Sequence, residues 1–219
     1  MGDLKARNWR ELIKPKSIEI ESETRSAFYG KFVCEPLERG FGITIGNALR
    51  RILLSSLQGA AIVSVKFDNV VHEFSSIPGV IEDVTEIILN LKEINLKLID
   101  VEEAVLNLSV EGEGVVTAGD ISPNESVEIL NPDKQIATLS KKGKLNMEMI
   151  VKMGKGYVPA ERDSASNIEI GDILIDASFS PIKKVNYIIS NARVGQKTDY
   201  DRLTIEIFTD CSVLPEDAL

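Results

Sequence analysis

The amino-acid sequence predicts an α+β fold of antiparallel strands with two main helices. Several short runs alternate apolar and polar residues, which is the period of a strand with one buried face. Two longer segments repeat apolar residues every three or four positions instead, which is the period of an amphipathic helix. Gly, Pro and Asn interrupt the sequence between the strand-like runs, as the turns of an antiparallel sheet require.

The chain opens with two strand-like runs followed by its strongest helix. Residues 17–23 alternate and residues 27–34 are rich in β-formers, so the two runs are predicted to pair antiparallel. Residues 44–57 are predicted to form a helix that Thr44 caps and Gly59 ends. One apolar stripe runs along this helix: Ile45, Ala48, Leu49, Ile52 and Leu53.

A third strand-like run, residues 60–70, leads into the second predicted helix. That helix follows the turn 75–79, and Glu82 and Asp83 place negative charge at the positive end of its dipole. Its apolar stripe consists of Val80, Val84, Ile87, Ile88 and Leu91.

The remaining chain is predicted to be mainly strands. Residues 95–156 divide into short strands, and residues 159–167 are polar and predicted to form a loop. Residues 182–189 and 203–208 are predicted strands, separated by residues 193–202. The cleanest alternation in the middle of the chain places four side chains on one face: Leu145, Met147, Met149 and Val151.

The composition is that of an ordinary globular protein, with 43% hydrophobic and 27% charged residues among 219. No run of 18 apolar residues occurs and the N-terminus is polar, so neither a membrane span nor a secretion signal is expected. Cys34 and Cys211 are too few for a disulfide framework or a zinc site. We expect free thiols in a reducing cytoplasm.

The net charge of −9 argues against tight non-specific binding of nucleic acid by this chain alone. The charge is unevenly spread: +3 over residues 1–60, −11 over residues 61–180 and −1 over residues 181–219. An acidic segment inserted into a near-neutral outer domain would give this distribution.

Few residues suggest catalysis. His72 is the single histidine, which excludes a multi-histidine metal site and argues against a Ser-His-Asp triad, so a structural role is expected. Asp199 and Asp201 could bind a cation, although such local clusters more commonly cap turns.

The segment 40–46, Gly-Phe-Gly-Ile-Thr-Ile-Gly, suggests a rival function. Glycines before a helix let a dinucleotide pyrophosphate approach its N-terminus, and Asp68 lies 22 residues beyond Gly46. However, the third glycine comes one residue late for the G-x-G-x-x-G pattern. The preceding residues 34–39 are also charged and contain proline, unlike a buried parallel strand. Titration with dinucleotides would test this rival.

The first predicted helix carries a second pattern on roughly the opposite side from its stripe. Asn47, Arg51 and Leu54 recur at i, i+4 and i+7, with Arg50 beside them. A large apolar residue among arginines on an outer face is common in protein interfaces. The alternative is a single exposed leucine among solvated charges.

At these residues the sequence resembles the alpha subunits of bacterial RNA polymerase. Two segments carry most of the likeness: residues 35–42, Glu-Pro-Leu-Glu-Arg-Gly-Phe-Gly, and residues 46–56, Gly-Asn-Ala-Leu-Arg-Arg-Ile-Leu-Leu-Ser-Ser. The likeness continues in the family's order through residues 72–75, 82–83, 90–92, 156–160 (Gly-Tyr-Val-Pro-Ala), 176–177, 180–181, 193–196 and 198–199. It extends from about Ile13 to Leu219.

The resemblance implies a discontinuous dimerisation domain, residues 1–58 with 174–219, built on an antiparallel sheet. Residues 59–173 would then form an inserted, mostly-β domain. It further implies a non-catalytic scaffold, in which two copies pair and hold the beta and beta-prime subunits for DNA-directed nucleotidyl transfer. No cofactor or metal is expected, DNA would be contacted only indirectly, and the location would be cytoplasmic, in the nucleoid-associated polymerase.

The resemblance also assigns contact residues. The two-fold interface is expected to contain the helix stripe Ile45, Ala48, Leu49, Ile52 and Leu53. Arg51 is expected to contact the beta subunit, with Leu54 and Glu86 near the same surface. The full set expected to contact the beta or beta-prime subunit is Asn47, Arg50, Arg51, Leu54, Glu86, Lys92, Ile175 and Ile182.

Two of the sequence's departures from the family bear on stability and on the dimer. Family members continue beyond residues 215–219 into a long helix that contributes to the dimer, then a linker and a small DNA-binding domain, so a weaker dimer is expected for this stretch. Members commonly carry Gly in the turn where Cys211 stands. A residue with a Cβ disfavours positive φ, so strain is expected there.

Overall fold

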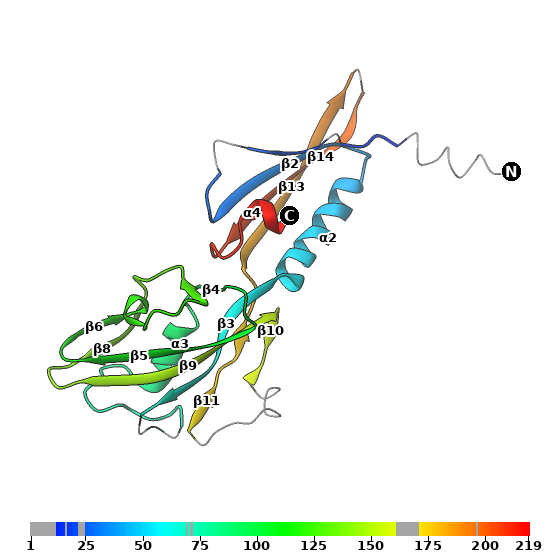
Figure 1. The fold of residues 1–219 in the computed structure, drawn as a ribbon. Helices are drawn as coiled ribbons and strands as arrows, with labels where there is room; N and C mark the ends of the chain where they lie inside the picture. The colour runs from blue at the N-terminus through cyan, green and yellow to red at the C-terminus, as the bar shows by residue number, and fades with distance from the viewer. Residues whose placement is uncertain are drawn as a thin grey trace. The chain divides into compact units, whose positions relative to one another are not determined.

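The computed structural model describes residues 12–15, 17–21, 25–68, 70, 72–160, 171–195 and 197–219. The chain divides into two compact units, one formed by the N-terminal part to Ser55 together with Ile182–Leu219, the other by Ser56–Pro181 (Figure 1). Antiparallel sheets with few helices make up both units, which confirms the predicted α+β class with a mostly-β inserted part.

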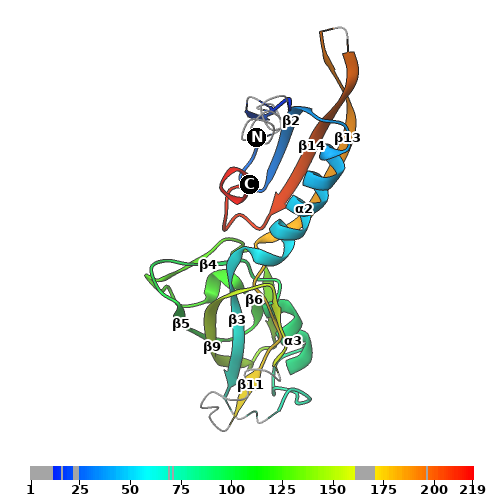
Figure 2. The ribbon, with the colours of Figure 1, turned by 90° about the vertical axis from the view of Figure 1, so that its right-hand side faces the viewer.

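The first unit is a four-stranded antiparallel sheet in the order β1-β2-β14-β13, with helix α2 lying against β13 and β14 (Figure 2). The predicted pairing of the first two strands is confirmed, since Ile18 lies opposite Cys34. The elements of this unit are β1 (Ile18–Ile20), β2 (Tyr29–Leu37), α2 (Phe41–Ser56), β13 (Ile182–Val194), β14 (Lys197–Thr209) and α4 (Pro215–Ala218).

Strands β13 and β14 are longer than the sequence predicted. They form one hairpin that turns at Gly195, whose φ is 63°, so part of the predicted connection 193–202 is strand. Most of the added pairs are polar or exposed, for example Asn191 opposite Asp201, although Ala192 is buried. Hydrophobic periodicity therefore gives no signal over this end of the hairpin, which is held by the backbone ladder.

Among its described residues, the second unit has a four-stranded antiparallel sheet, β11-β3-β9-β5, with three two-stranded ladders, one α-helix and one 3-10 helix. The ladders are β4-β7, β6-β8 and β10-β12. The elements are β3 (Gln58–Phe67), α3 (Val84–Leu91), β4 (Leu96–Leu98), β5 (Glu103–Glu111), β6 (Gly114–Thr117), η2 (Ala118–Asp120), β7 (Val127–Ile129), β8 (Gln135–Leu139), β9 (Lys144–Lys155), β10 (Tyr157–Val158), β11 (Asp172–Leu174) and β12 (Ala177–Ser178).

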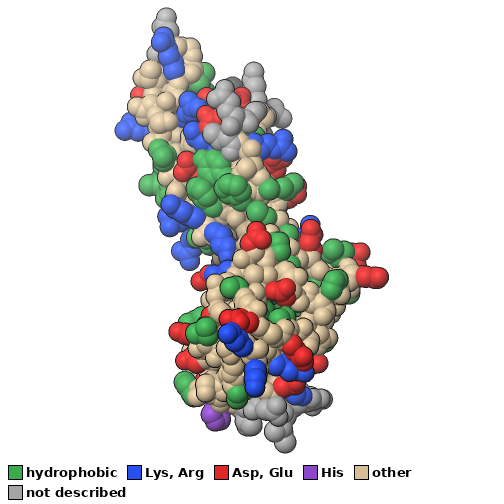
Figure 3. Space-filling view, turned by 90° about the vertical axis from the view of Figure 1, so that its left-hand side faces the viewer, with side chains coloured by type: hydrophobic (Ala, Val, Ile, Leu, Met, Phe, Trp, Pro, Cys, Tyr) green, Lys and Arg blue, Asp and Glu red, His purple; other side chains and the backbone are tan. Residues whose placement is uncertain are grey.

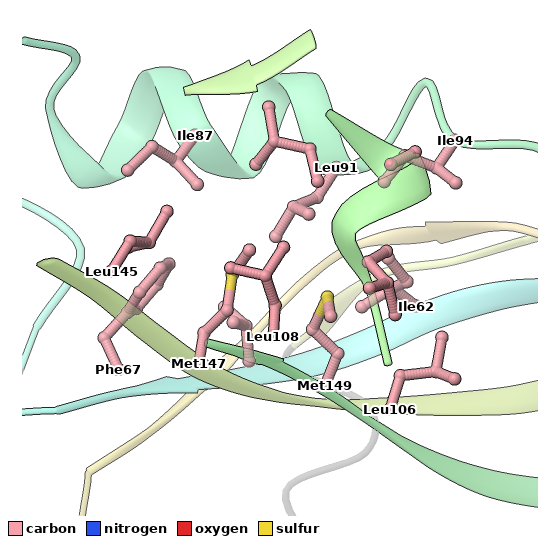
Figure 4. Close-up of a cluster of buried hydrophobic side chains, with 14 of the residues drawn as sticks. Ile62, Phe67, Ile87, Leu91, Ile94, Leu106, Leu108, Leu145, Met147 and Met149 are labelled. Atoms are coloured by element: carbon pink, nitrogen blue, oxygen red, sulfur yellow. The ribbon is translucent and has the colours of Figure 1, made fainter. Parts of the chain in front are cut away.

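Helix α3 covers the core of the second unit. The predicted alternation in β9 is confirmed, because its four apolar side chains are all buried, and Leu145, Met147 and Met149 point toward the helix in Figure 4. Asp83 is the N-cap of α3 and its carboxylate accepts a hydrogen bond of 2.7 Å from the Glu86 backbone N–H. Val80 was predicted within the helical stripe, but it lies before the helix and bridges to Leu139.

The two units meet after Ser55 and after Pro181, whereas the predicted boundaries were at 58–59 and 173–174. Ile173 of β11 pairs with Val65 of β3, and the Ile175 N–H donates to the Val63 carbonyl at 2.8 Å. Phe179 similarly binds the Gly156 carbonyl. These backbone bonds keep the chain in the second unit as far as Pro181.

Cys211 has a positive φ, as expected for a turn position where family members commonly carry Gly. Its φ is 75°, in the left-handed region that costs an L-residue about 1–2 kcal/mol. We expect Cys211→Gly to raise the free energy of unfolding by about 0.5–1 kcal/mol, because relief of strain exceeds the added chain entropy of glycine. Denaturant titration of the two proteins measures this difference, and a Cys211→Ala variant should show no gain.

Candidate functional site

Helix α2 begins three residues earlier than the sequence predicted. Thr44 does not cap it; instead, one carboxylate oxygen of Asp201 accepts hydrogen bonds from the backbone N–H groups of Gly40 at 2.8 Å and Gly42 at 3.1 Å. A carboxylate at this position also suits the positive end of the helix dipole. Of the two aspartates considered as a cation pair, Asp201 thus serves to fix the start of α2.

The glycines of the 40–46 segment have a packing role. A Cβ on Gly42 would lie 3.0 Å from the Asp201 carboxylate, and one on Gly46 would lie 2.8 Å from the Tyr187 ring and 3.0 Å from Leu203. The helix therefore lies close against β13 and β14 only because these positions carry no side chain.

The same geometry argues against the dinucleotide-binding rival. A pyrophosphate would need the N–H groups at the helix N-terminus, and Asp201 already binds two of them. The strand before the helix, β2, pairs antiparallel with both of its neighbours, whereas a dinucleotide fold has a parallel sheet.

Helix α2 has one face buried within its own unit. Gly42, Gly46 and Leu53 are its buried residues, and Leu53 is only 2% exposed. Of the predicted interface stripe, Leu53 therefore packs inside the chain, and Leu49 is half-buried beside it. Two of the three buried residues of α2 are glycines, which add nothing to hydrophobic periodicity. The apolar stripe predicted from the sequence was therefore centred on the flank beside the buried face.

The flank beside the buried face remains exposed although it is apolar. We call it the apolar flank of α2, defined by four residues spaced four, three and four apart, which puts them on one side of a helix. Phe41 and Ile52 are 46% and 53% exposed, Ala48 is exposed and Ile45 is half-buried. Four apolar side chains in a row on a helix surface are characteristic of a site that another protein surface covers. The members of the apolar flank are Phe41, Ile45, Ala48 and Ile52.

The opposite flank of α2 carries the mixed polar pattern identified in the sequence. Asn47, Arg50, Arg51 and Leu54 are all exposed there. Within the part of the chain that the structure describes, no carboxylate forms an ion pair with the Arg51 guanidinium. The Arg51 side chain is thus not used in a local salt bridge with those residues.

The other predicted contact residues differ in their exposure. Glu86 is exposed on α3 and Lys92 follows the end of that helix, so both can meet a partner. Ile175 and Ile182 are each 4% exposed and pack inside their units. Their side chains do not lie on the surface, so any influence they have on a partner passes through exposed neighbours.

Sequence reasoning missed one polar cluster beside Lys92. Asp176 accepts a hydrogen bond of 2.9 Å from the Ala160 N–H and another from the Tyr157 hydroxyl, and its carboxylate lies 3.6 Å from the Lys92 ammonium. These bonds, first the one from Ala160, lower the pKa of Asp176, and the bond to Asp176 raises the pKa of Tyr157. Pairing of β10 with β12 brings the cluster together, which no local pattern reveals.

The residues considered for catalysis do not assemble a reactive site in the described part of the chain. His72 is exposed, with Nδ1 3.0 Å from the Ser75 hydroxyl. No group of three or more His, Cys, Asp and Glu side chains among the described residues is placed to hold a metal ion. Cys34 and Cys211 are free thiols. None of the described helices combines the length and apolar character needed to cross a membrane.

The surface charge is unevenly distributed. In Figure 3, hydrophobic side chains gather on the first unit with Lys and Arg around them, whereas Asp and Glu side chains are frequent over the second unit. This agrees with the acidic segment that the sequence places in the middle of the chain.

Comparison with known proteins identifies the family. Residues 65–180 match the family described as RNA polymerase Rpb3/RpoA insert domain. DNA-directed RNA polymerase subunit alpha of Geobacter metallireducens is 61% identical over 213 residues, which are 97% of this chain and 63% of that protein. The subunits of the same name from Desulfosudis oleivorans and Syntrophus aciditrophicus are each 58% identical, over 100% and 97% of this chain and 64% and 62% of their own lengths.

The chain therefore spans somewhat less than two thirds of the length of these relatives. The family match covers more than half of the chain, and the identities extend over nearly all of it. This chain belongs to the RNA polymerase Rpb3/RpoA family and is similar throughout to the alpha subunits of DNA-directed RNA polymerase.

Proposed function

We propose that this chain is a non-catalytic scaffold of DNA-directed RNA polymerase that pairs with a second copy and holds the beta and beta-prime subunits. The observation that carries the proposal is the apolar flank of α2, which stays exposed beside a helix face that is already buried. Its exposure needs a partner surface, and a second copy provides the same flank for a two-fold contact.

The proposed dimer buries the apolar flank, while the opposite side of the helix stays outside. Asp201 and the glycines hold α2 against the sheet, so the helix meets a partner as a rigid element. Preformed surfaces of this kind lose little conformational freedom on association. The pair would then present the opposite flank of α2, which carries Arg51, twice to larger subunits.

The polymerase reaction itself belongs to the proposed complex. DNA-directed nucleotidyl transfer would take place on other chains, and this chain would contribute their relative placement. A dimeric adaptor unrelated to transcription is the alternative. Co-purification separates the two, since the scaffold should retain the large polymerase subunits and the adaptor should not.

Arg51 is expected to be a principal contact to the beta subunit. Its guanidinium offers five donors in a fixed fork, suited to carboxylate or carbonyl groups of a partner. We expect Arg51→Ala to weaken beta-subunit capture by about 1–3 kcal/mol while the thermal midpoint of the chain stays unchanged. Arg51→Lys keeps the charge without the fork and should recover part of the loss.

Arg39→Ala is the matched control, because Arg39 is an exposed arginine of the same unit that lies before α2. Its capture of the beta subunit should equal that of the unaltered chain. An Arg51→Ala protein that melts much earlier yet captures the beta subunit normally would show that Arg51 serves local stability alone.

A further inference from the structure

Phe41 lies at the end of the apolar flank of α2, and one carboxylate oxygen holds the residue on each side of it. That oxygen belongs to Asp201 and accepts from the N–H groups of Gly40 at 2.8 Å and Gly42 at 3.1 Å. The Phe41 side chain between them is 46% exposed. We propose that Asp201 is a positioning residue for self-association, which acts by fixing the place of the Phe41 ring. This inference rests on the proposed pairing of two copies.

The first turn of α2 is held by bonds from outside the helix. The first N–H groups of any helix lack partners within it, and the end frays unless other groups accept from them. The Phe41 N–H donates to the Glu38 carbonyl at 2.9 Å, between the two N–H groups that Asp201 accepts. Three successive N–H groups are therefore bonded, and the direction in which the Phe41 side chain leaves the backbone is fixed.

Asp201 is itself fixed within the sheet of the first unit. It lies opposite Leu37 of β2 on one side and Asn191 of β13 on the other. Leu37 is the last residue of β2 and is 4% exposed, so the chain leaves the sheet beside Asp201 and enters α2 at Phe41. The carboxylate thus ties the first turn of α2 directly to β14.

Glycine on both sides makes Phe41 the one side chain that this arrangement places. Gly40 has a φ of 88°, in the left-handed region that favours glycine. Gly42 leaves the room that the carboxylate occupies, since a Cβ there would lie 3.0 Å from a carboxylate oxygen. The residues held by Asp201 therefore offer a second copy only the Phe41 ring.

A fixed ring lowers the cost of association. Ordering backbone and side chain on binding consumes part of the favourable interaction energy, and a surface that is ordered beforehand avoids that loss. Large aromatic side chains are also frequent among the few residues that dominate an interface. Without Asp201 the first turn of α2 would fray, and the Phe41 ring would have to be ordered when two copies meet.

Sedimentation velocity at graded concentrations measures the dimer dissociation constant of the unaltered chain and its variants. We expect Asp201→Ala to raise this constant about five-fold or more, the loss typical of an important interface residue. Asp201→Asn keeps an acceptor oxygen and should recover most of the affinity, because asparagine and aspartate cap helices about equally well. Asp199→Ala is the matched control, since it removes an exposed carboxylate from the same strand, and its constant should not change. All proteins are compared well below their unfolding midpoints.

A double-mutant cycle with Phe41→Ala separates positioning from general stability. If Asp201 acts through the Phe41 ring, Asp201→Ala should change the dimer dissociation constant at most about two-fold once the ring is absent. Amide hydrogen exchange at residues 40–42 should be faster in Asp201→Ala and recover in Asp201→Asn. Losses of affinity that simply multiply in the double variant would show that Asp201 does not act through Phe41, and would overturn the inference.

The outcomes also separate this inference from the proposed pairing. If the unaltered chain dimerises and Asp201→Ala dimerises equally well, the positioning role is wrong and the pairing stands. If the unaltered chain stays monomeric at every concentration, the pairing is overturned, and the positioning role with it.

Discussion

Ile52→Glu is expected to convert the proposed dimer into monomers over the concentration range in which the unaltered chain is dimeric. Ile52 is 53% exposed and belongs to the apolar flank that the two copies would share. A carboxylate buried there without a partner should raise the dimer dissociation constant at least about a hundred-fold, or roughly 3 kcal/mol. Sedimentation velocity at graded concentrations measures the change.

Ile188→Glu is the control for this charge substitution. Ile188 is 60% exposed and lies on the face of the sheet away from α2, because the adjacent Tyr187 faces Gly46 of α2. The dimer dissociation constant of the Ile188→Glu protein should equal that of the unaltered chain. If both variants dissociate alike, added charge and not the apolar flank governs association.

Gly46→Val is expected to destabilise the chain by about 2–3 kcal/mol, the upper part of the range for overpacking. Any Cβ at this position meets the Tyr187 ring at 2.8 Å, and Leu203 beside it is fully buried. Helix propensity alone would favour the substitution slightly, because glycine is the poorer helix former. The sign of the measured change thus decides between close packing and propensity.

Thermal and denaturant unfolding measure the effect of Gly46→Val. Asn47→Ala serves as the stability control, because Asn47 is the next residue and is exposed. It should change the free energy of unfolding by no more than about 0.5 kcal/mol. A Gly46→Val protein as stable as the unaltered chain would mean that α2 does not need close contact with the sheet.

The sequence predicted those elements whose own side chains face a core. Helix α3 and strand β9 follow from periodicity, since Ile87, Leu91 and Met147 all point into one cluster. The pairing of β1 with β2 followed from two adjacent strand-like runs. In each case the sequence signal and the packing lie on the same few residues.

Features that depend on distant parts of the chain could not be predicted in this way. The cap of α2 comes from Asp201, which is 161 residues from Gly40, so Thr44 was the best local candidate. The face of α2 toward the sheet is marked by glycines, which give no hydrophobic signal. Tyr157 and Asp176 meet because β10 pairs with β12, a contact that only the folded chain reveals.

Exposure also decides which of the predicted contact residues can touch a partner subunit. The resemblance to alpha subunits indicated Lys92 and Ile175 together, but only Lys92 lies at the surface. Ile175 is buried, and the next residue, Asp176, is the one whose side chain lies near Lys92. In strands of only two or three residues, the sequence does not show which side chains point to solvent.

Native mass spectrometry of this chain mixed with the beta subunit tests the central claim most directly. The account predicts a complex of two copies of this chain with one beta subunit. It also predicts that Ile52→Glu removes this species, whereas Ile188→Glu leaves it intact. A stable complex of one copy with one beta subunit, formed equally by the unaltered chain and by Ile52→Glu, would contradict the account.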